Sequence, residues 1–165
     1  MGTPRSSFNS SAYIIEYMDS TRTIELLAAL ILERVAHVAA DYFFQNGYMA
    51  FGKRKSWLPA VVHGIAYGLS FGLTALIFYL VGTLSGKPEF ASGALLLVQW
   101  RSLLPICITH VFIDKLALAS YWYKFYNGYW KLKVEDLEPW QKAVCLQVDQ
   151  GMHQFINVGC LIWFS

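Results

Sequence analysis

The longest uncharged segment of the chain, Trp57–Thr83, contains no Asp, Glu, Lys or Arg. A helix of this length, rising about 1.5 Å per residue, can cross the roughly 30 Å hydrocarbon layer of a membrane with some tilt. A helix that is apolar all round would otherwise need neighbours on every side, which is difficult to arrange in a protein of 165 residues. We therefore predict a membrane span here rather than a core helix of a soluble protein.

The composition supports this prediction and excludes several other classes of protein. Hydrophobic residues make up 56% of the chain and charged residues 15%, whereas soluble domains carry about 25% charged residues. The high apolar content excludes a disordered chain, and three cysteines in apolar segments are too few for a disulfide scaffold. A net charge of +2 provides no reason to expect a nucleic-acid partner.

Three other apolar segments contain a few charged residues each, namely Ile24–Gln45, Phe90–Tyr121 and Trp140–Phe164. No segment shows the alternation of a β-strand, and short turn-forming stretches separate the four segments. We therefore predict an all-α fold, a four-helix up-down transmembrane bundle. The third helix contains Pro105, so we expect it to be kinked near that residue or built from two pieces.

The predicted helical membrane domain covers residues 24–165, preceded by a flexible or amphipathic arm at residues 1–23. Basic residues concentrate in the first and third connections, while the second contains only Lys87. The positive-inside rule therefore places those two connections in the cytoplasm and both termini in the periplasm of an inner membrane. The basic residues of the two connections are Lys53, Arg54, Lys55, Lys124, Lys131 and Lys133.

All four histidines of the chain lie within these apolar segments, and three of them have an aspartate four residues away. Residues at this spacing share one face of a helix, so each pair can direct two ligands to one place. Counted from the basic connections, all seven residues fall in the cytoplasmic half of the bundle. They are the pairs His37 and Asp41, His110 and Asp114, Asp149 and His153, together with His63.

A single such pair is most simply a histidine satisfied by a carboxylate. Three pairs at similar depth favour a shared site, because ionisable groups within a membrane are costly and mark function. Imidazole and carboxylate ligands suit zinc, manganese or iron, so we predict one or two divalent ions held by the seven residues. A single ion with some carboxylates orienting the histidines is an equally consistent arrangement.

The polar face of the first helix extends the same spacing to Glu33 and Gln45. Glu33 or Asp41 could serve as the general base, and Gln45 and Gln150 could support the ligands. Solvation at the end of the helix is an equally good explanation for Gln45. Arg34 and Lys115, like Arg101, could bind an anionic group, although an ordinary ion pair or a side chain reaching toward the membrane surface is the better explanation for each.

The second helix carries small residues every four positions, at Gly64, Gly68 and Gly72. This spacing lets transmembrane helices approach closely and would bring His63 near its partners. Tyr67 lies one turn beyond His63, where an aromatic ring that fills the bundle is the simplest interpretation.

Four short motifs, in this order, resemble a family of small bacterial and phage membrane proteins known as a domain of unknown function. They are His37-x-x-x-Asp41-Tyr-Phe-Phe-Gln45, Leu58-Pro-Ala-Val-Val-His63-Gly64, His110-x-x-x-Asp114-Lys115 and Asp149-Gln150-x-x-His153. The resemblance covers roughly residues 24–165 and implies a helical membrane domain, with phage or prophage origin as one option. More loosely, the pattern is similar to membrane-bound metal-dependent hydrolases, which implies metal binding at the seven His and Asp positions.

The leading hypothesis is therefore a metal-dependent hydrolase that acts on a phosphoester or lipid-linked substrate from the cytoplasmic leaflet. A second hypothesis is a non-enzymatic membrane or phage-associated interaction protein in which the His and Asp cluster is structural. A third is a b-type haem held by two histidines, but three paired aspartates would be a surplus around haem ligands.

Overall fold

The computed structural model describes residues 10–129, 131–134 and 136–164, and side chains from Asp19 onward. The described residues form helices and no strands, which confirms the predicted all-α class. The helices are α1 (Ser10–Tyr42), α2 (Gly47–Gly52), α3 (Trp57–Leu84), α4 (Pro88–Leu97), α5 (Trp100–Leu116), α6 (Leu118–Tyr126) and α7 (Pro139–Phe164).

Helix α3 matches the predicted uncharged span almost residue for residue, beginning at Trp57 and ending at Leu84. Ser56 precedes it in an extended conformation, and Gly86 reverses the chain after it with a φ of 67°. By length and composition, α3 is the one described helix that by itself could cross a membrane.

The third predicted helix consists of two pieces, which is one of the two alternatives that the sequence left open. The break between the pieces does not lie at Pro105. Helices α4 and α5 meet at an angle of 49° across Val98 and Gln99. Gln99 has an extended ψ of 126°, which interrupts the helical hydrogen-bond pattern. Pro105 lies inside α5, where its missing N–H removes one backbone hydrogen bond without ending the helix. Together, α4 and α5 would be a second candidate span.

A second break shortens the predicted helix at its other end. Ala117 adopts a left-handed conformation, with φ of 50° and ψ of 40°, and separates α5 from α6. The prediction of continuous helix as far as Tyr121 was therefore wrong at this residue. An alanine gives no sequence signal for such a turn, because left-handed conformations favour glycine or asparagine.

The first helix begins within the segment 1–23 that the sequence set apart as an arm. Helix α1 starts at Ser10 and runs without interruption to Tyr42. Residues 1–9 and the side chains of residues 10–18 lie outside the described part of the chain. The predicted amphipathic character of the arm falls on these residues. The first connection contains the short helix α2, whose N-cap Asn46 accepts a hydrogen bond from the backbone of Met49 at 3.1 Å.

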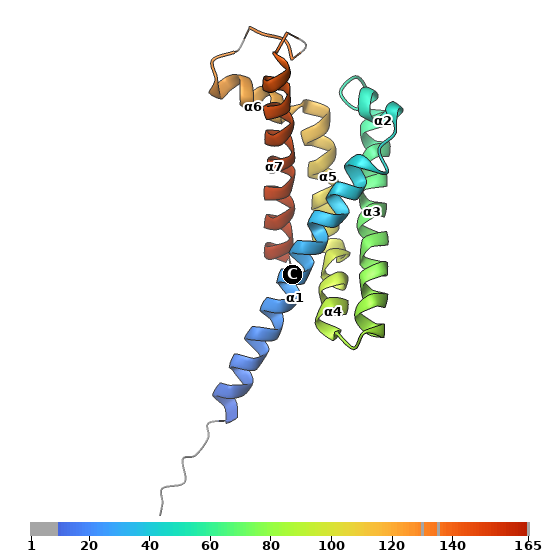
Figure 1. The fold of residues 1–165 in the computed structure, drawn as a ribbon, viewed down its shortest axis with the longest axis vertical. Helices are drawn as coiled ribbons and strands as arrows, with labels where there is room; N and C mark the ends of the chain where they lie inside the picture. Colours follow the sequence, from blue (N-terminus) through green and yellow to red (C-terminus); the bar gives the residue numbers. More distant parts are fainter. Residues whose placement is uncertain (1–9, 130, 135, 165) are drawn as a thin grey trace, which may run out of the picture.

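Four long elements run up, down, up and down and close into a ring. Contacts join α1 to α3, α3 to α5, α5 to α7, and α7 back to α1. The bent pair α4–α5 takes the third place, with α4 packed against α1 and α3 at the lower end of the bundle (Figure 1). The connection containing α2 and the one between α6 and α7 lie at the upper end (Figure 1).

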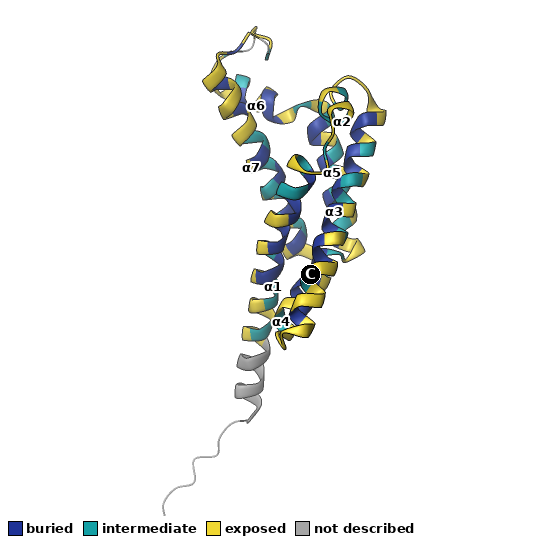
Figure 2. Ribbon diagram, turned by 45° about the vertical axis from the view of Figure 1, so that its right-hand side comes forward, coloured by how far each residue is buried: buried dark blue, intermediate teal, exposed yellow. Residues whose placement is uncertain are grey.

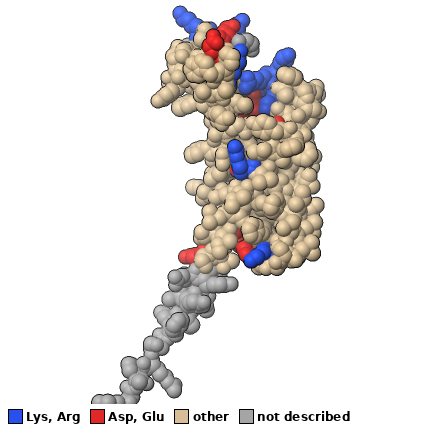
Figure 3. Space-filling model, viewed as in Figure 1, with Lys and Arg blue, Asp and Glu red and all other residues tan. Residues whose placement is uncertain are grey.

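The interior divides into an apolar part and a polar part. Buried apolar side chains that include Leu32, Phe71, Leu97 and Leu161 form the main hydrophobic cluster. Buried polar side chains lie on the same helices and include the four histidines and Asp114, to which Lys53 at the end of α2 is hydrogen-bonded. The exposed surface is correspondingly apolar: Lys, Arg, Asp and Glu gather mainly at the two ends, and most of the surface between them is uncharged (Figure 3).

Candidate metal centre

The four histidines come from four different helices and meet in the bundle interior. His37 lies on α1, His63 on α3, His110 on α5 and His153 on α7, and each is at most 1% exposed. Asp41 and Asp114, one helical turn from His37 and His110, face the same region with side chains 9% and 3% exposed. The i and i+4 spacing thus places each pair on an inward face, as predicted from the sequence.

Asp41, His63 and His110 form one group whose ligand atoms all lie within 4.8 Å of one another. Nε2 of His63 lies 3.0 Å from Nε2 of His110, 3.3 Å from Oδ1 of Asp41 and 3.3 Å from Oδ2 of Asp114. Nε2 of His110 lies 3.8 Å from Oδ1 of Asp41. Ligand atoms bound at about 2.1 Å to one ion are about 3.0–3.4 Å apart in octahedral or tetrahedral geometry, so this spacing fits one cation.

Two atoms of this group have the chemistry that a cation requires. Oδ1 of Asp41 is buried and has no hydrogen-bond partner among the described residues, while its Oδ2 accepts a hydrogen bond from Gln150 Nε2 at 2.9 Å. Nε2 of Gln45, at 3.2 Å, and Nε2 of His110, at 3.0 Å, both lie within hydrogen-bonding distance of Nε2 of His63, and a neutral His63 that accepts from them carries its lone pair on that nitrogen. The residues present therefore fit a divalent ion.

His110, Asp114 and His153 form a second group that shares His110 with the first. Nε2 of His110 lies 3.2 Å from Oδ2 of Asp114, and Nε2 of His153 lies 3.9 Å from Oδ1 of Asp114. Nδ1 of His153 donates a hydrogen bond to the Asp149 carbonyl at 2.9 Å, which leaves the lone pair of a neutral ring on Nε2. That buried Nε2 has no hydrogen-bond partner in the described chain. Because the groups share a residue, they form one continuous site.

His37 belongs to neither group, and both of its ring nitrogens are engaged in hydrogen bonds. Nε2 donates to Oε1 of Gln150 at 2.9 Å, so Nδ1 of the neutral ring accepts from the Tyr67 hydroxyl at 2.6 Å. His37 still touches the site, since its Nε2 is 3.4 Å from Oδ2 of Asp41. The structure therefore places His37 beside the candidate ligands, joined to them through Gln150 and Asp41.

Glu33 lies at the other end of this hydrogen-bonded network. Nδ2 of Asn157 donates to Oε1 of Glu33 at 2.7 Å and to the Tyr67 hydroxyl at 2.6 Å. Glu33 is fully buried, and its Oε1 is 4.0 Å from Nδ1 of His37. Between Glu33 and Asp41, the network thus runs through Asn157, Tyr67, His37 and Gln150.

Asp149 and the predicted anion-binding residues lie farther out. The Asp149 carboxylate is half-buried, 3.9 Å from Nδ1 of His153, and it belongs to neither candidate group. Arg34 is exposed on the outside of α1. Lys115 donates to the carbonyl of Arg54 at 2.9 Å and lies over the ring of Trp57, so the structure does not bring it to the site.

Sequence reasoning missed three residues of the site. Lys53, counted only as a basic loop residue, donates a hydrogen bond to Oδ2 of Asp114 at 2.8 Å. Tyr67 was interpreted as filling the bundle, yet it and Asn157 are both hydrogen-bonded in the network. Tyr67 follows His63, and Asn157 follows His153, by four residues. The four-residue spacing that made Gln45 a candidate would therefore also have identified Tyr67 and Asn157. No pattern in the sequence indicated that Lys53 belongs to the site.

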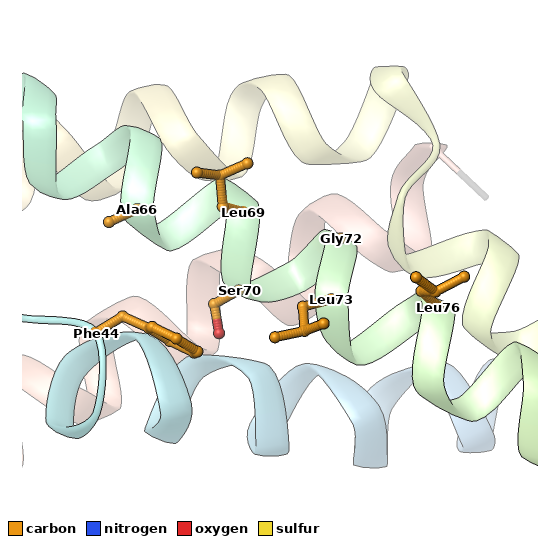
Figure 4. A pocket seen from close by; sticks show the side chains of 7 residues that line it. All are labelled: Phe44, Ala66, Leu69, Ser70, Gly72, Leu73 and Leu76. Atoms are coloured by element: carbon orange, nitrogen blue, oxygen red, sulfur yellow. The ribbon is translucent and has the colours of Figure 1, made fainter.

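An apolar pocket with a volume of about 510 Å³ lies between α3 and the end of α1 (Figure 4). It follows one side of α3 and is covered at one end by Phe44, the neighbour of Gln45 in sequence (Figure 4). Ser70 also faces it, but its hydroxyl donates to the carbonyl of Ala36 at 2.9 Å. The lining residues are Phe44, Ala66, Leu69, Ser70, Gly72, Leu73 and Leu76.

Comparison with known proteins does not assign this arrangement to a family. No family model matches the chain, and neither a curated protein nor a solved structure matches it. The resemblance to the family of small bacterial and phage membrane proteins therefore stays a prediction. What the site does has to be argued from its own geometry.

Proposed function

We propose that this protein is a membrane-embedded, metal-dependent hydrolase that acts on a phosphoester or lipid-linked substrate. The observation that carries the proposal is the approach of Asp41 Oδ1, His63 Nε2 and His110 Nε2 to within 3.0–3.8 Å of one another. Three ligands from three different helices leave coordination positions for water and substrate, as catalytic metal sites do.

The balance of charge at the site supports a bound cation. Asp41 and Asp114 are largely buried, and of the described residues Lys53 is the one lysine or arginine in an ion pair with either. Glu33 adds a third buried carboxyl group whose hydrogen bond comes from neutral Asn157. Buried carboxylates require a paired charge or a metal ion, and Lys53 balances only one of the two, so the other needs a cation or a protonated histidine.

The distribution of apolar residues supports a bilayer around the bundle. The most apolar window of α3 is only 33% buried within the protein, whereas the core helix of a soluble protein would be mostly buried. Ile31 on α1, Leu69 on α3 and Phe155 on α7 are 64%, 69% and 80% exposed, while four histidines are buried. Buried and exposed residues alternate along the helices (Figure 2), and the exposed apolar and buried polar residues named above are the arrangement expected when lipid is the surrounding solvent.

In the proposed orientation, α1, α3, the α4–α5 pair and α7 cross the inner membrane. The connections that contain Lys53–Lys55 and Lys131–Lys133 face the cytoplasm. The candidate metal centre then lies toward the cytoplasmic leaflet. The apolar pocket beside α3 faces the hydrocarbon layer and suits the tail of a lipid-linked substrate (Figure 4).

A divalent ion bound here would act as a Lewis acid that activates water and polarises the scissile group. Asp41 Oδ1 would serve as the proton acceptor where Asp114 takes its place as the ligand beside His63 and His110, because one oxygen cannot bind the ion and accept the proton together. The Gln150 amide holds the other oxygen of Asp41 and orients the carboxylate. Glu33 is connected to Asp41 only through the hydrogen bonds of Asn157, Tyr67, His37 and Gln150. In this proposal Glu33 therefore anchors the network that orients His37 and does not accept the proton.

The burial of the site favours one alternative, a structural metal or polar cluster in a non-enzymatic membrane protein. The four histidines are at most 1% exposed, and the described pockets line other surfaces. A fully closed coordination sphere would hold the helices together without turnover. The haem alternative lacks support, because 3.0 Å between Nε2 of His63 and Nε2 of His110 leaves no space for a porphyrin between these rings.

The deciding experiment combines metal analysis with a hydrolysis assay of the full chain purified in detergent. We expect one or two divalent ions per chain and hydrolysis of a phosphoester panel that includes lipid phosphates. Asp41→Asn should lose both the metal and the activity, while Arg34→Gln, on the outer face of α1, should retain both. Retained hydrolysis by Asp41→Asn contradicts the proposal. A bound metal without hydrolysis of the panel favours the structural alternative.

A further inference from the structure

Lys53 reaches the metal centre from outside the four-helix ring. It follows α2, and its backbone N–H donates to the carbonyl of Met49 at 3.0 Å, which continues the helical turn. Its side chain is only 14% exposed, and Nζ donates a hydrogen bond to Oδ2 of Asp114 at 2.8 Å. The adjacent loop residues Arg54 and Lys55 are exposed. The first connection thus directs one of its three consecutive basic residues inward.

The carboxylate oxygen that Lys53 contacts is also close to two candidate ligands. Oδ2 of Asp114 lies 3.3 Å from Nε2 of His63 and 3.2 Å from Nε2 of His110. The ammonium group is therefore separated from the imidazole nitrogens by one oxygen atom. A ligand bound among these groups would meet a fixed positive charge on the side of the first connection.

The hydrogen-bonding capacity of Lys53 is only partly used. An ammonium group has three N–H donors. Among the described residues, Nζ donates to Oδ2 of Asp114, and this single hydrogen bond leaves two N–H groups for another acceptor. Arg54 and Lys55 add positive charge around the same connection, which raises the local concentration of anions.

The positive charges of the site would lie where one anion can contact them. One divalent ion carries as many charges as Asp41 and Asp114 together, and Lys53 adds one positive charge at Asp114, while Glu33 and Asp149 are further carboxyl groups 4.0 Å from His37 and 3.9 Å from His153. A phosphate monoester carries between about −1.5 and −2 charges near neutral pH and presents three oxygen acceptors. It can therefore contact an ion and an ammonium group simultaneously.

We propose that Lys53 is the anion-binding residue of the metal centre and that the ligand of this site carries a phosphate monoester. The proposal rests on the metal binding of the proposed function and adds a substrate class and a residue to it. The competing explanation is that Lys53 only neutralises Asp114. In that case its removal alters metal affinity and leaves phosphate binding unchanged.

The test measures binding of inorganic phosphate to the full chain loaded with Mn²⁺ in detergent. Paramagnetic broadening of the phosphorus resonance reports phosphate next to the ion, and a separate titration reports Mn²⁺ affinity. We expect Lys53→Gln to bind Mn²⁺ at least as tightly as the wild type but phosphate about tenfold more weakly or worse, through loss of a charge-assisted hydrogen bond. Lys53→Arg should restore much of the phosphate binding, which excludes misfolding as the cause.

Lys55→Gln is the matched control, because it removes the same charge from an exposed position in the same connection. Its phosphate affinity should stay within about twofold of the wild type at moderate salt, where surface charges are screened. If Lys53→Gln binds phosphate as tightly as the wild type, the assignment of Lys53 is overturned and the proposed function is not affected. Failure of the wild-type chain to bind Mn²⁺ overturns this proposal together with the proposed function.

Two phosphate monoesters distinguish the source of the ligand. Phosphatidic acid in nanodiscs represents a lipid headgroup, and glycerol 3-phosphate represents a soluble ester. Lys53-dependent broadening of phosphatidic acid supports a lipid ligand, and the same effect with glycerol 3-phosphate alone supports a soluble one. Broadening of neither by the Mn²⁺-loaded wild type contradicts the phosphate monoester class.

Discussion

At the scale of single residues, each polar group of the site contacts defined partners through particular atoms. Asp41 uses Oδ2 to accept a hydrogen bond from Gln150 and leaves Oδ1 facing His63 and His110. His153 uses Nδ1 to contact the carbonyl of Asp149 and leaves Nε2 facing Asp114. One atom of each side chain thus holds its orientation while the other remains for a cation, which is how outer partners organise metal ligands.

Replacing Asp41 by Asn should remove a ligand without changing the shape of the side chain. We expect the affinity for Mn²⁺ or Zn²⁺ to fall by at least about 100-fold, because losing an outer partner alone costs about 10–100-fold. The control is Asp149→Asn, whose carboxylate lies 3.9 Å from Nδ1 of His153 and outside both candidate groups. It should lower the affinity about tenfold or less. The metal affinities are measured by competition with a chelating dye. An equal loss of affinity in the two variants would contradict the assignment of Asp41 as a metal ligand.

Replacing Tyr67 by Phe should destabilise the protein, because the hydroxyl connects His37 and Asn157. Without it, Nδ1 of His37 loses its donor and Asn157 loses one acceptor, all in a buried place. An unsatisfied buried polar group costs about 1–3 kcal/mol, so we expect a clearly lower unfolding temperature in detergent. Tyr79→Phe is the control on the same helix, since Tyr79 is 39% exposed. A Tyr67→Phe variant as stable as Tyr79→Phe would contradict the network.

At the scale of helices, the bend between α4 and α5 allows the third element to serve two purposes. Helix α4 packs against α1 and α3 through small residues, and α5 carries His110 and Asp114 to the site. A Cβ atom placed on Gly93 would lie 2.7 Å from Cβ of Ala28 and 2.8 Å from the carbonyl oxygen of Glu25. The close contact between α4 and α1 therefore depends on the absence of a side chain at Gly93.

Replacing Gly93 by Ala should separate α4 from α1 and lower the free energy of unfolding. Overpacking of this kind costs about 1–3 kcal/mol, partly offset by the better helix propensity of alanine. Gly72→Ala is the control, since a Cβ there meets no atom within 4 Å, and it should be neutral or slightly stabilising. Thermal unfolding of both variants in the same detergent measures the difference. Equal stability of the two variants would contradict the close packing of α4 against α1.

At the scale of the whole molecule, the bundle has apolar exterior faces and a polar interior at one end. Most charged side chains gather at the two ends of the bundle (Figure 3). This distribution is the reverse of a soluble protein, where buried ionisable groups are rare. It is consistent with a bilayer as solvent and with a metal centre that helps to hold the helices together.

The orientation of the chain can be measured with single cysteines in a variant that lacks the three native ones. Lys55→Cys lies in the first connection and Lys87→Cys in the second, and both positions are exposed. With a membrane-impermeant maleimide added to spheroplasts, we expect labelling of Lys87→Cys and protection of Lys55→Cys until the membrane is permeabilised. Labelling of both before permeabilisation, or of Lys55→Cys alone, would contradict the proposed topology.

Removing the metal should loosen the whole bundle, because the candidate ligands come from different helices. A ligand present at 100 times its dissociation constant stabilises the folded state by about 2.7 kcal/mol. We therefore expect a chelator to lower the unfolding temperature and added Mn²⁺ or Zn²⁺ to restore it. The Asp41→Asn variant should show little response to either addition. An unchanged unfolding temperature of wild type under chelation would contradict a structurally coupled metal site.

The periodicity of the sequence was sufficient to predict the all-α class, helix α3 and most of the polar residues that face inward. The uncharged segment predicted α3, and the four-residue spacing of His and Asp predicted which helix faces would meet. These properties are local, because the α-helix places residues four apart on one face whatever surrounds it. The same spacing also contained the signal for Tyr67 and Asn157.

The tertiary structure alone decided which of these residues contact one another and through which atoms. The break at Gln99 and the left-handed Ala117 have no local sequence signal, and they set the position of α5. Nothing in the sequence indicated that Lys53 contacts Asp114 or that hydrogen bonds occupy both nitrogens of His37. The physical reason is that helical periodicity determines the direction in which a side chain points, whereas distances between helices arise from packing many residues at once.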